Sequence, residues 1–147
     1  MSRRLAHLRT QRGNTIVEFA LSVSLLWALF SGMFQFGYSM YVYNRLLAAV
    51  DQGARYASRV DFDAPNHNFV GQVRNMAVYG NPSGTGNKIL GVLNTSNINV
   101  TWNADAAGLP RTITVSVTNF SVPVIFTSFN FNGKPRVTMK YVGVYKS

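Results

Sequence analysis

The residues of this chain whose types and spacing could do chemistry lie near its N-terminus: Gly13, Asn14 and Glu18. Glu18 is the only charged residue between Asn14 and Asn44, and a carboxylate in hydrocarbon is costly. If the chain were cut after Gly13, Asn14 would gain a free ammonium four residues before Glu18, and this charge could neutralise the carboxylate within one chain or between neighbours. Alternatively, Glu18 lies at headgroup depth, where the positive end of the helix dipole favours it.

The element that must position these residues is a long apolar run that continues from Ile16 to Tyr43. A helix needs about 20 apolar residues to cross the hydrocarbon core, so residues 14–43 are predicted to span a membrane once. The apolar region of a cleaved secretory signal is only about 7–15 residues long, which argues against such a signal. Basic residues accumulate on the cytoplasmic side of a span, so residues 1–13 are predicted to be a cytoplasmic leader, with four arginines: Arg3, Arg4, Arg9 and Arg12.

This arrangement resembles the class III signal of type IV prepilins and pseudopilins. Three stretches, Ile16–Leu21, Phe36–Tyr38 and Gly53–Ala57, further resemble the N-terminal region of TadE-like proteins, minor pseudopilins of the tight-adherence (Flp) pilus. The resemblance implies that a prepilin peptidase cuts between Gly13 and Asn14, and that Glu18 pairs with an amine during subunit docking.

The resemblance also implies which partners and which location to expect. The partners would be the prepilin peptidase, other pilins or pseudopilins, and the assembly platform of the bacterial inner membrane. The C-terminal domain would be periplasmic, and the protein would act in pilus assembly or priming without a cofactor. The alternative is an uncleaved, single-pass, signal-anchored protein whose small extracytoplasmic domain binds a ligand or an envelope component. That alternative treats Gly13 and Glu18 as coincidence.

Beyond the span, helical spacing of apolar residues continues through residues 44–60, so one unbroken helix is predicted to about Arg59. Ala49, Gly53 and Ala57 form a ladder of small residues at a spacing of four, which permits close approach of another backbone. This ladder is expected to pack either against the chain's own sheet or against another subunit. The polar residues of the opposite face, which include Arg55, are interpreted as a solvated surface.

Residues 61–147 are predicted to form a small exported domain, which makes the chain a pilin-like α+β protein. After a linker, Asn68 is expected to begin a short second helix that Gly80 ends. Three stretches with a period of two then predict a small three-stranded antiparallel sheet covered by helix. Their alternating residues are Ile98, Val100 and Trp102, then Ile113, Val115 and Val117, and finally Val137, Met139 and Tyr141.

The connection between the second and third predicted strands, residues 121–135, is long and unusually apolar. We expect it either to cover the core or, if exposed, to contact a partner or lipid headgroups. The residues concerned are Val122, Pro123, Ile125, Phe126 and Phe129.

Several classes of function are disfavoured by composition. The chain has no cysteine, and His67 is the only histidine outside the leader, so neither a catalytic residue nor a metal site is predicted. Asp61 and Asp63 are too few for a calcium loop and are interpreted as solvated linker acids. The formal net charge is +9, but four of the fourteen basic residues lie in the leader and the rest are scattered, so nucleic acid is not an expected partner.

Overall fold

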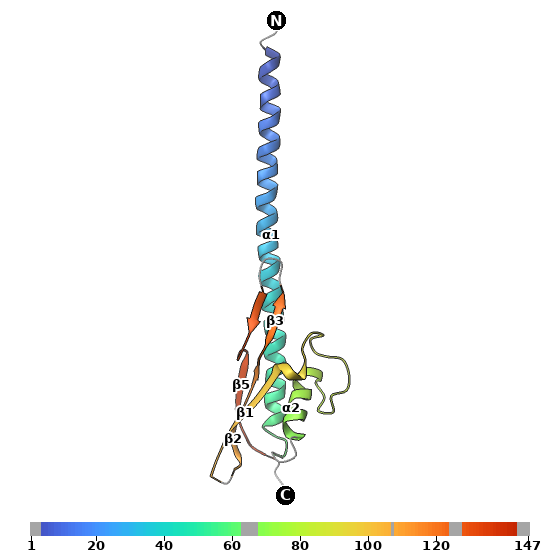
Figure 1. The fold of residues 1–147 in the computed structure, drawn as a ribbon, viewed down its shortest axis with the longest axis vertical. Coiled ribbons are helices and arrows are strands. Elements are labelled where there is room, and N and C mark those ends of the chain that lie inside the picture. The colour runs from blue at the N-terminus through green and yellow to red at the C-terminus, as the bar shows by residue number, and fades with distance from the viewer. Residues whose placement is uncertain (1–3, 63–67, 107, 124–127, 144–147) are drawn as a thin grey trace. The chain divides into compact units, whose positions relative to one another are not determined.

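The computed structural model describes residues 4–62, 68–106, 108–123 and 128–143, with side chains from Asn14 onward. It contains two compact units, Met1–Tyr38 and Ser39–Ser147. Figure 1 shows the elements in chain order from blue to red. The predicted Ile125, Phe126, Asp63 and His67 lie outside the described residues.

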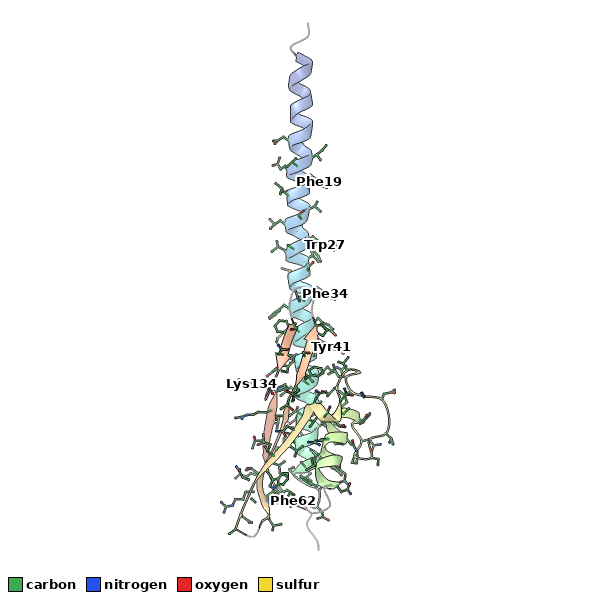
Figure 2. All side chains as sticks on the ribbon, viewed as in Figure 1. Phe19, Trp27, Phe34, Tyr41, Phe62 and Lys134 are labelled. Atoms are coloured by element: carbon green, nitrogen blue, oxygen red, sulfur yellow. The ribbon has the colours of Figure 1, made fainter. Side chains whose placement is uncertain are left out.

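Helix α1 runs without interruption over Arg4–Ala57, and it supplies all the described structure of the first unit. Its apolar side chains are uncovered there: Trp27 is 75% exposed and Phe34 is 70% exposed. Figure 2 shows the side chains of this part of α1 projecting from the helix surface, with Phe19, Trp27 and Phe34 labelled. The apolar window within Asn14–Ala57 has a mean hydropathy of 1.8 and is 0% buried. By length and composition, α1 can therefore cross a membrane.

Helix α2 covers Asn68–Tyr79, at the bounds that the sequence predicts. It ends because Gly80 adopts a φ of +68°, which favours glycine, and because the Gly80 N–H donates to the Met76 carbonyl at 3.0 Å. Its buried residues recur at helical spacing, so α2 presents one apolar side to the core; they are Phe69, Val73, Ala77 and Val78.

The predicted three-stranded antiparallel sheet is confirmed. Its strands are β1 (Ile98–Ala104), β2 (Pro110–Val117) and β5 (Arg136–Lys140), in the order β1-β2-β5, and a short 3-10 helix, η1 (Thr95–Asn97), precedes β1. In β2 the side chains of Ile113, Val115 and Val117 are buried. On the other face, the Thr114 and Thr138 hydroxyl oxygens are 2.7 Å apart across the strand pair. The alternation of apolar and hydroxyl residues thus places one face in the core and leaves the other wetter.

A second, two-stranded antiparallel sheet lies where the sequence predicts only a connection. It consists of β3 (Phe120–Pro123) and β4 (Ser128–Phe131). Phe120 and Val122 are buried while Ser121 and Pro123 are exposed, so the apolar connection follows a period of two. Pro123 is tolerated because β3 belongs to a two-stranded sheet and is therefore an edge strand, paired on one side only.

The second unit has a single described core, formed where the last turns of α1 meet α2 and the sheets. The helix α1 contributes Leu46, Val50 and Ala54, and their side chains are fully buried. The same cluster includes Phe69 and Val73 from α2 and Ile98, Ile113, Val115 and Val117 from the sheet. The structure therefore confirms an α+β fold with a long N-terminal helix and a short second helix, and it adds the β3–β4 hairpin.

Candidate functional site

Gly13, Asn14 and Glu18 all lie within helix α1, so the Gly13–Asn14 peptide bond has helical surroundings. Asn14 and Glu18 are four residues apart and share one side of the helix, and both side chains are exposed. One turn further along, the Ser22 hydroxyl donates to the Glu18 carbonyl at 2.9 Å. This bond satisfies the hydroxyl without water, as a helix in lipid requires. If the chain began at Asn14, its N-terminal amine would lie at the start of the helix, one turn before the Glu18 carboxylate.

The small-residue ladder of α1 is covered by the chain's own core, since Ala49, Gly53 and Ala57 are all buried. A Cβ at Gly53 would lie 3.1 Å from the Ala77 Cβ and 3.4 Å from the Val73 carbonyl oxygen. The missing side chain thus lets α1 approach α2 closely. Gly53 therefore faces the second helix instead of the sheet or another subunit.

The predicted contact residues between 121 and 135 divide between the core and the surface. Val122 is only 5% exposed, whereas Phe129 is 40% exposed and Pro123 is also at the surface. The Phe131 ring centroid lies 6.2 Å from that of Tyr43. The hairpin therefore covers part of the core while it leaves apolar groups accessible.

A concave site between the end of α1 and α2 was not predicted from the sequence. Its cavity of about 510 Å³ is lined by Gln52, Arg55, Tyr56, Arg59, Val60 and Met76. The Tyr56 hydroxyl donates to Gln72 Oε1 at 2.9 Å, and burial raises the pKa of Tyr56 above its ordinary value. Arg55 is held by Asp51, with Nε 2.8 Å from Oδ2. The sequence signal that could have indicated this concave site is the polar face of α1. Such a face is equally typical of a solvated surface.

Metal and cofactor chemistry find little support in the described part of the chain. There, no group of three or more His, Cys, Asp or Glu side chains is placed to hold a metal ion. The sequence prediction of a protein without metal or cofactor stays a prediction.

Comparison with known families bears on α1. The family model described as TadE-like protein matches residues 13–55. The N-terminal segment is TadE-like. This match confirms the resemblance; it covers residues 16–21, 36–38 and 53–55 of the three stretches, and it includes Gly13, Asn14 and Glu18. Comparisons with curated proteins and with solved structures gave no match.

The TadE-like segment, residues 13–55, contains the uncovered apolar part of α1 and continues into the core of the second unit. One apolar helix near the N-terminus, long enough to cross a membrane, is consistent with a single-pass membrane protein.

Proposed function

We propose that this protein is a minor pseudopilin that acts in assembly or priming of a Tad/Flp-type adhesive pilus. The observation that carries the proposal is the family match over residues 13–55, which begins at Gly13 and includes Glu18 and the apolar helix. The protein inserts into the bacterial inner membrane with residues 1–13 cytoplasmic, because the leader carries arginines and no acid. The α+β domain is then periplasmic.

Processing supplies the chemistry of the N-terminus. A prepilin peptidase hydrolyses the Gly13–Asn14 peptide bond, which leaves a carboxylate on Gly13 and an ammonium on Asn14. Glu18, one turn along the same side of α1, is then within reach of a positive charge from its own chain or a neighbouring subunit. Pairing reduces the cost of holding the carboxylate at membrane depth, so docking favours subunits with a free N-terminus.

The role of the protein is structural. The exposed apolar side chains of α1, such as Trp27 and Phe34, offer the surface on which other pilins, pseudopilins or the inner-membrane platform pack. The ladder at Gly53 is occupied by α2, so it is not available to those partners.

Intact-mass spectrometry of protein co-expressed with a prepilin peptidase tests this proposal. We expect the mass to fall by that of residues 1–13, and Gly13→Ala to abolish the loss. Gly32→Ala is the matched control, because Gly32 lies in the same helix and nothing lies within 4 Å of an added Cβ. A full-length mass for the parent chain in the presence of the peptidase would contradict processing.

The concave site beside Tyr56 favours a second candidate, an uncleaved signal-anchored protein whose extracytoplasmic domain binds a ligand there. If this second function is correct, the intact mass of the chain should not change with the peptidase or with Gly13→Ala. Substitution of Arg59, which lines the concave site, should then alter ligand binding without changing membrane insertion. The mass measurement therefore separates the two functions.

A further inference from the structure

The outer edge of strand β5 carries backbone groups that the proposed function leaves without a role. In the order β1-β2-β5, this strand pairs only with β2 among the described residues. The Tyr141 N–H donates to the Arg111 carbonyl at 3.0 Å, so the backbone groups of odd-numbered residues face β2. Those of the even-numbered residues face away from β2, and no described residue pairs with them. They belong to Arg136, Thr138 and Lys140.

The other edge of the same sheet is partly closed, which sets β5 apart. Helix α2 lies against β1, and the Arg74 Nε donates to the Ile98 carbonyl, on the outer side of β1, at 3.0 Å. Beyond β5, the Val142 N–H donates to the Ser58 carbonyl, so the end of α1 closes the edge again there. In Figure 1, α2 and β5 lie on opposite sides of α1. The open stretch is therefore confined to β5 itself.

The core face of β5 is also less covered than that of its neighbour. The side chains of Val137 and Met139 pack against the core but are only partly buried. Ile113 and Val115, directly opposite them on β2, are fully buried. A further strand along β5 would cover the remaining apolar surface and would satisfy the open N–H and C=O groups at the same time.

Basic side chains line this edge on the wetter face of the sheet. The Thr138 hydroxyl contacts that of Thr114 there. Arg136 and Lys140 lie two positions to either side of Thr138, so they share this face. Both are exposed, and neither forms an ion pair with the described residues. Because residues 110–147 also contain no Asp or Glu, charge favours an added strand with acidic residues opposite these two.

A second copy of this chain does not supply such a strand. No two acidic residues of the sequence lie four positions apart, as Arg136 and Lys140 do; the acids are Glu18, Asp51, Asp61, Asp63 and Asp105. Antiparallel pairing of two β5 edges about Thr138 would place Arg136 opposite Lys140, and like charges directly opposite are destabilising. The basic residues that keep this edge from pairing with itself thus select a different protein.

We propose that the open edge of β5 binds an extended acidic segment of another protein by β-strand addition. The segment pairs antiparallel with residues 136–140, with its acids opposite Arg136 and Lys140 and its apolar residues beside Val137 and Met139. Main-chain hydrogen bonds supply affinity, and the side chains supply selectivity. This inference goes beyond the proposed function and depends only on the fold of the second unit, so neither cleavage nor membrane insertion affects it.

The probe is the peptide Glu-Val-Thr-Val-Glu, blocked at both ends, and Lys-Val-Thr-Val-Lys is its charge-reversed control. Each is titrated into the isotope-labelled full chain in detergent micelles, and NMR follows binding and amide hydrogen exchange. We expect the acidic peptide to bind at least about fivefold tighter than the basic one. It should slow exchange at the open amides of Arg136, Thr138 and Lys140. The amides of Val137 and Met139 face β2 and should change little.

Charge reversal in the chain tests the selectivity. Lys140→Glu should bind the two peptides about equally, because each peptide then meets one like and one opposite charge. Arg111→Glu is the matched control, since it changes the net charge by the same amount. Arg111 is exposed on β2, on the face opposite Lys140, and β2 has a strand on each side. This control should keep the parent's preference for the acidic peptide.

The other outcomes overturn the proposal. If neither peptide slows the open amides, the basic residues only keep the edge from pairing. If the acidic peptide binds without slowing them, it contacts side chains and adds no strand. Open amides that are protected without peptide and lose this protection on dilution would show that a second copy occupies the edge. Equal loss of preference in Arg111→Glu would mean that net charge attracts the peptide. None of these results bears on cleavage after Gly13, which intact mass tests separately.

Discussion

At the residue scale, Gly53 determines how closely α1 and α2 approach. We expect Gly53→Ala to lower the free energy of unfolding by about 1 kcal/mol or more, because its Cβ would press on Ala77 at 3.1 Å and on the Val73 carbonyl at 3.4 Å. Gly71→Ala is the matched control, since Gly71 lies in helix α2 with nothing within 4 Å of an added Cβ. That change should stabilise by up to about 1 kcal/mol through helix propensity. Denaturant unfolding of the full chain in detergent compares them, and equal effects would contradict close packing at Gly53.

Tyr56 makes stability depend on pH in the alkaline range. Burial raises its pKa in the folded chain above the ordinary value of 10.0, so the unfolded chain loses the phenolic proton first as the pH rises. The contribution is fully present below about pH 10 and is lost as the pH rises through the folded pKa. We expect the stability difference between the parent and Tyr56→Phe to be constant below about pH 9 and to narrow above about pH 10. Thermal unfolding from pH 8 to 11 measures it, and a constant difference throughout would show that Tyr56 is not the cause.

The sequence revealed the unusual residues but not all of their neighbours. Glu18 is conspicuous because it is the only charge in a long apolar run, and Asn14 because of its spacing from Glu18. The ladder around Gly53 was also visible, but its contact with Ala77 depends on how two helices cross. Residue type and period carry no information about that crossing, so the chain's own sheet or another subunit was expected where α2 lies.

At the element scale, the chain after α1 is joined to the end of β5. The Tyr141 hydroxyl donates to the Val60 carbonyl at 3.1 Å and accepts the Phe62 N–H at 3.0 Å. The Val142 N–H donates to the Ser58 carbonyl at 2.9 Å. The Phe62 ring also packs edge-to-face on Phe69 and Trp102, so this junction links α1 to α2 and β1.

Removal of one hydroxyl should weaken this junction measurably. We expect Tyr141→Phe to lower the free energy of unfolding by about 1–3 kcal/mol, because two half-buried backbone groups lose their partner while the ring is retained. Tyr79→Phe is the control, since the Tyr79 hydroxyl forms no hydrogen bond with the described residues and the side chain also lies beside the core. Urea unfolding monitored by circular dichroism compares the two variants. Equal small losses would mean that the Tyr141 hydroxyl contributes little to the junction.

The elements with strong local signals were predictable, and the shorter ones were not. Asn68 and Gly80 bound a clear helical pattern, and Thr114 alternates with buried Ile113 and Val115, so α2 and β2 followed from the sequence. The strands β3 and β4 have four residues each, and Pro123 suggests a break instead of a strand end. Their pairing depends on contacts with α1, such as Phe131 on Tyr43, which no local pattern encodes.

At the scale of the whole molecule, the two units have separate roles in the proposed function. The first unit, Met1–Tyr38, exposes apolar helix surface that needs lipid or other subunits to cover it. The second, Ser39–Ser147, buries its own core with α2 and the sheet. On the proposed function, assembly depends on the first unit, and its contacts can be altered without unfolding the second.

Glu18 allows assembly to be separated from processing and folding. On the proposed function, Glu18→Gln and Glu18→Ala are both cut after Gly13, because the change lies more than one helical turn from the peptide bond. Both variants lose the carboxylate that pairs with an amine of a docking subunit. Loss of one partner from a desolvated ion pair costs about 3 kcal/mol. Each 1.4 kcal/mol is about a tenfold change in affinity, so pilus number should fall at least about tenfold.

Ser24→Ala is the matched control for both Glu18 variants, because the Ser24 hydroxyl only donates to the Ala20 carbonyl of its own helix, at 2.8 Å. It should leave both cleavage and piliation near the parent level. Intact mass reports cleavage and electron microscopy counts pili. If Glu18→Gln assembles normally but Glu18→Ala does not, hydrogen bonding or side-chain volume at this position matters and charge does not. Since Gln keeps the size and polarity of Glu, only equal defects in both variants support pairing of the carboxylate with an amine.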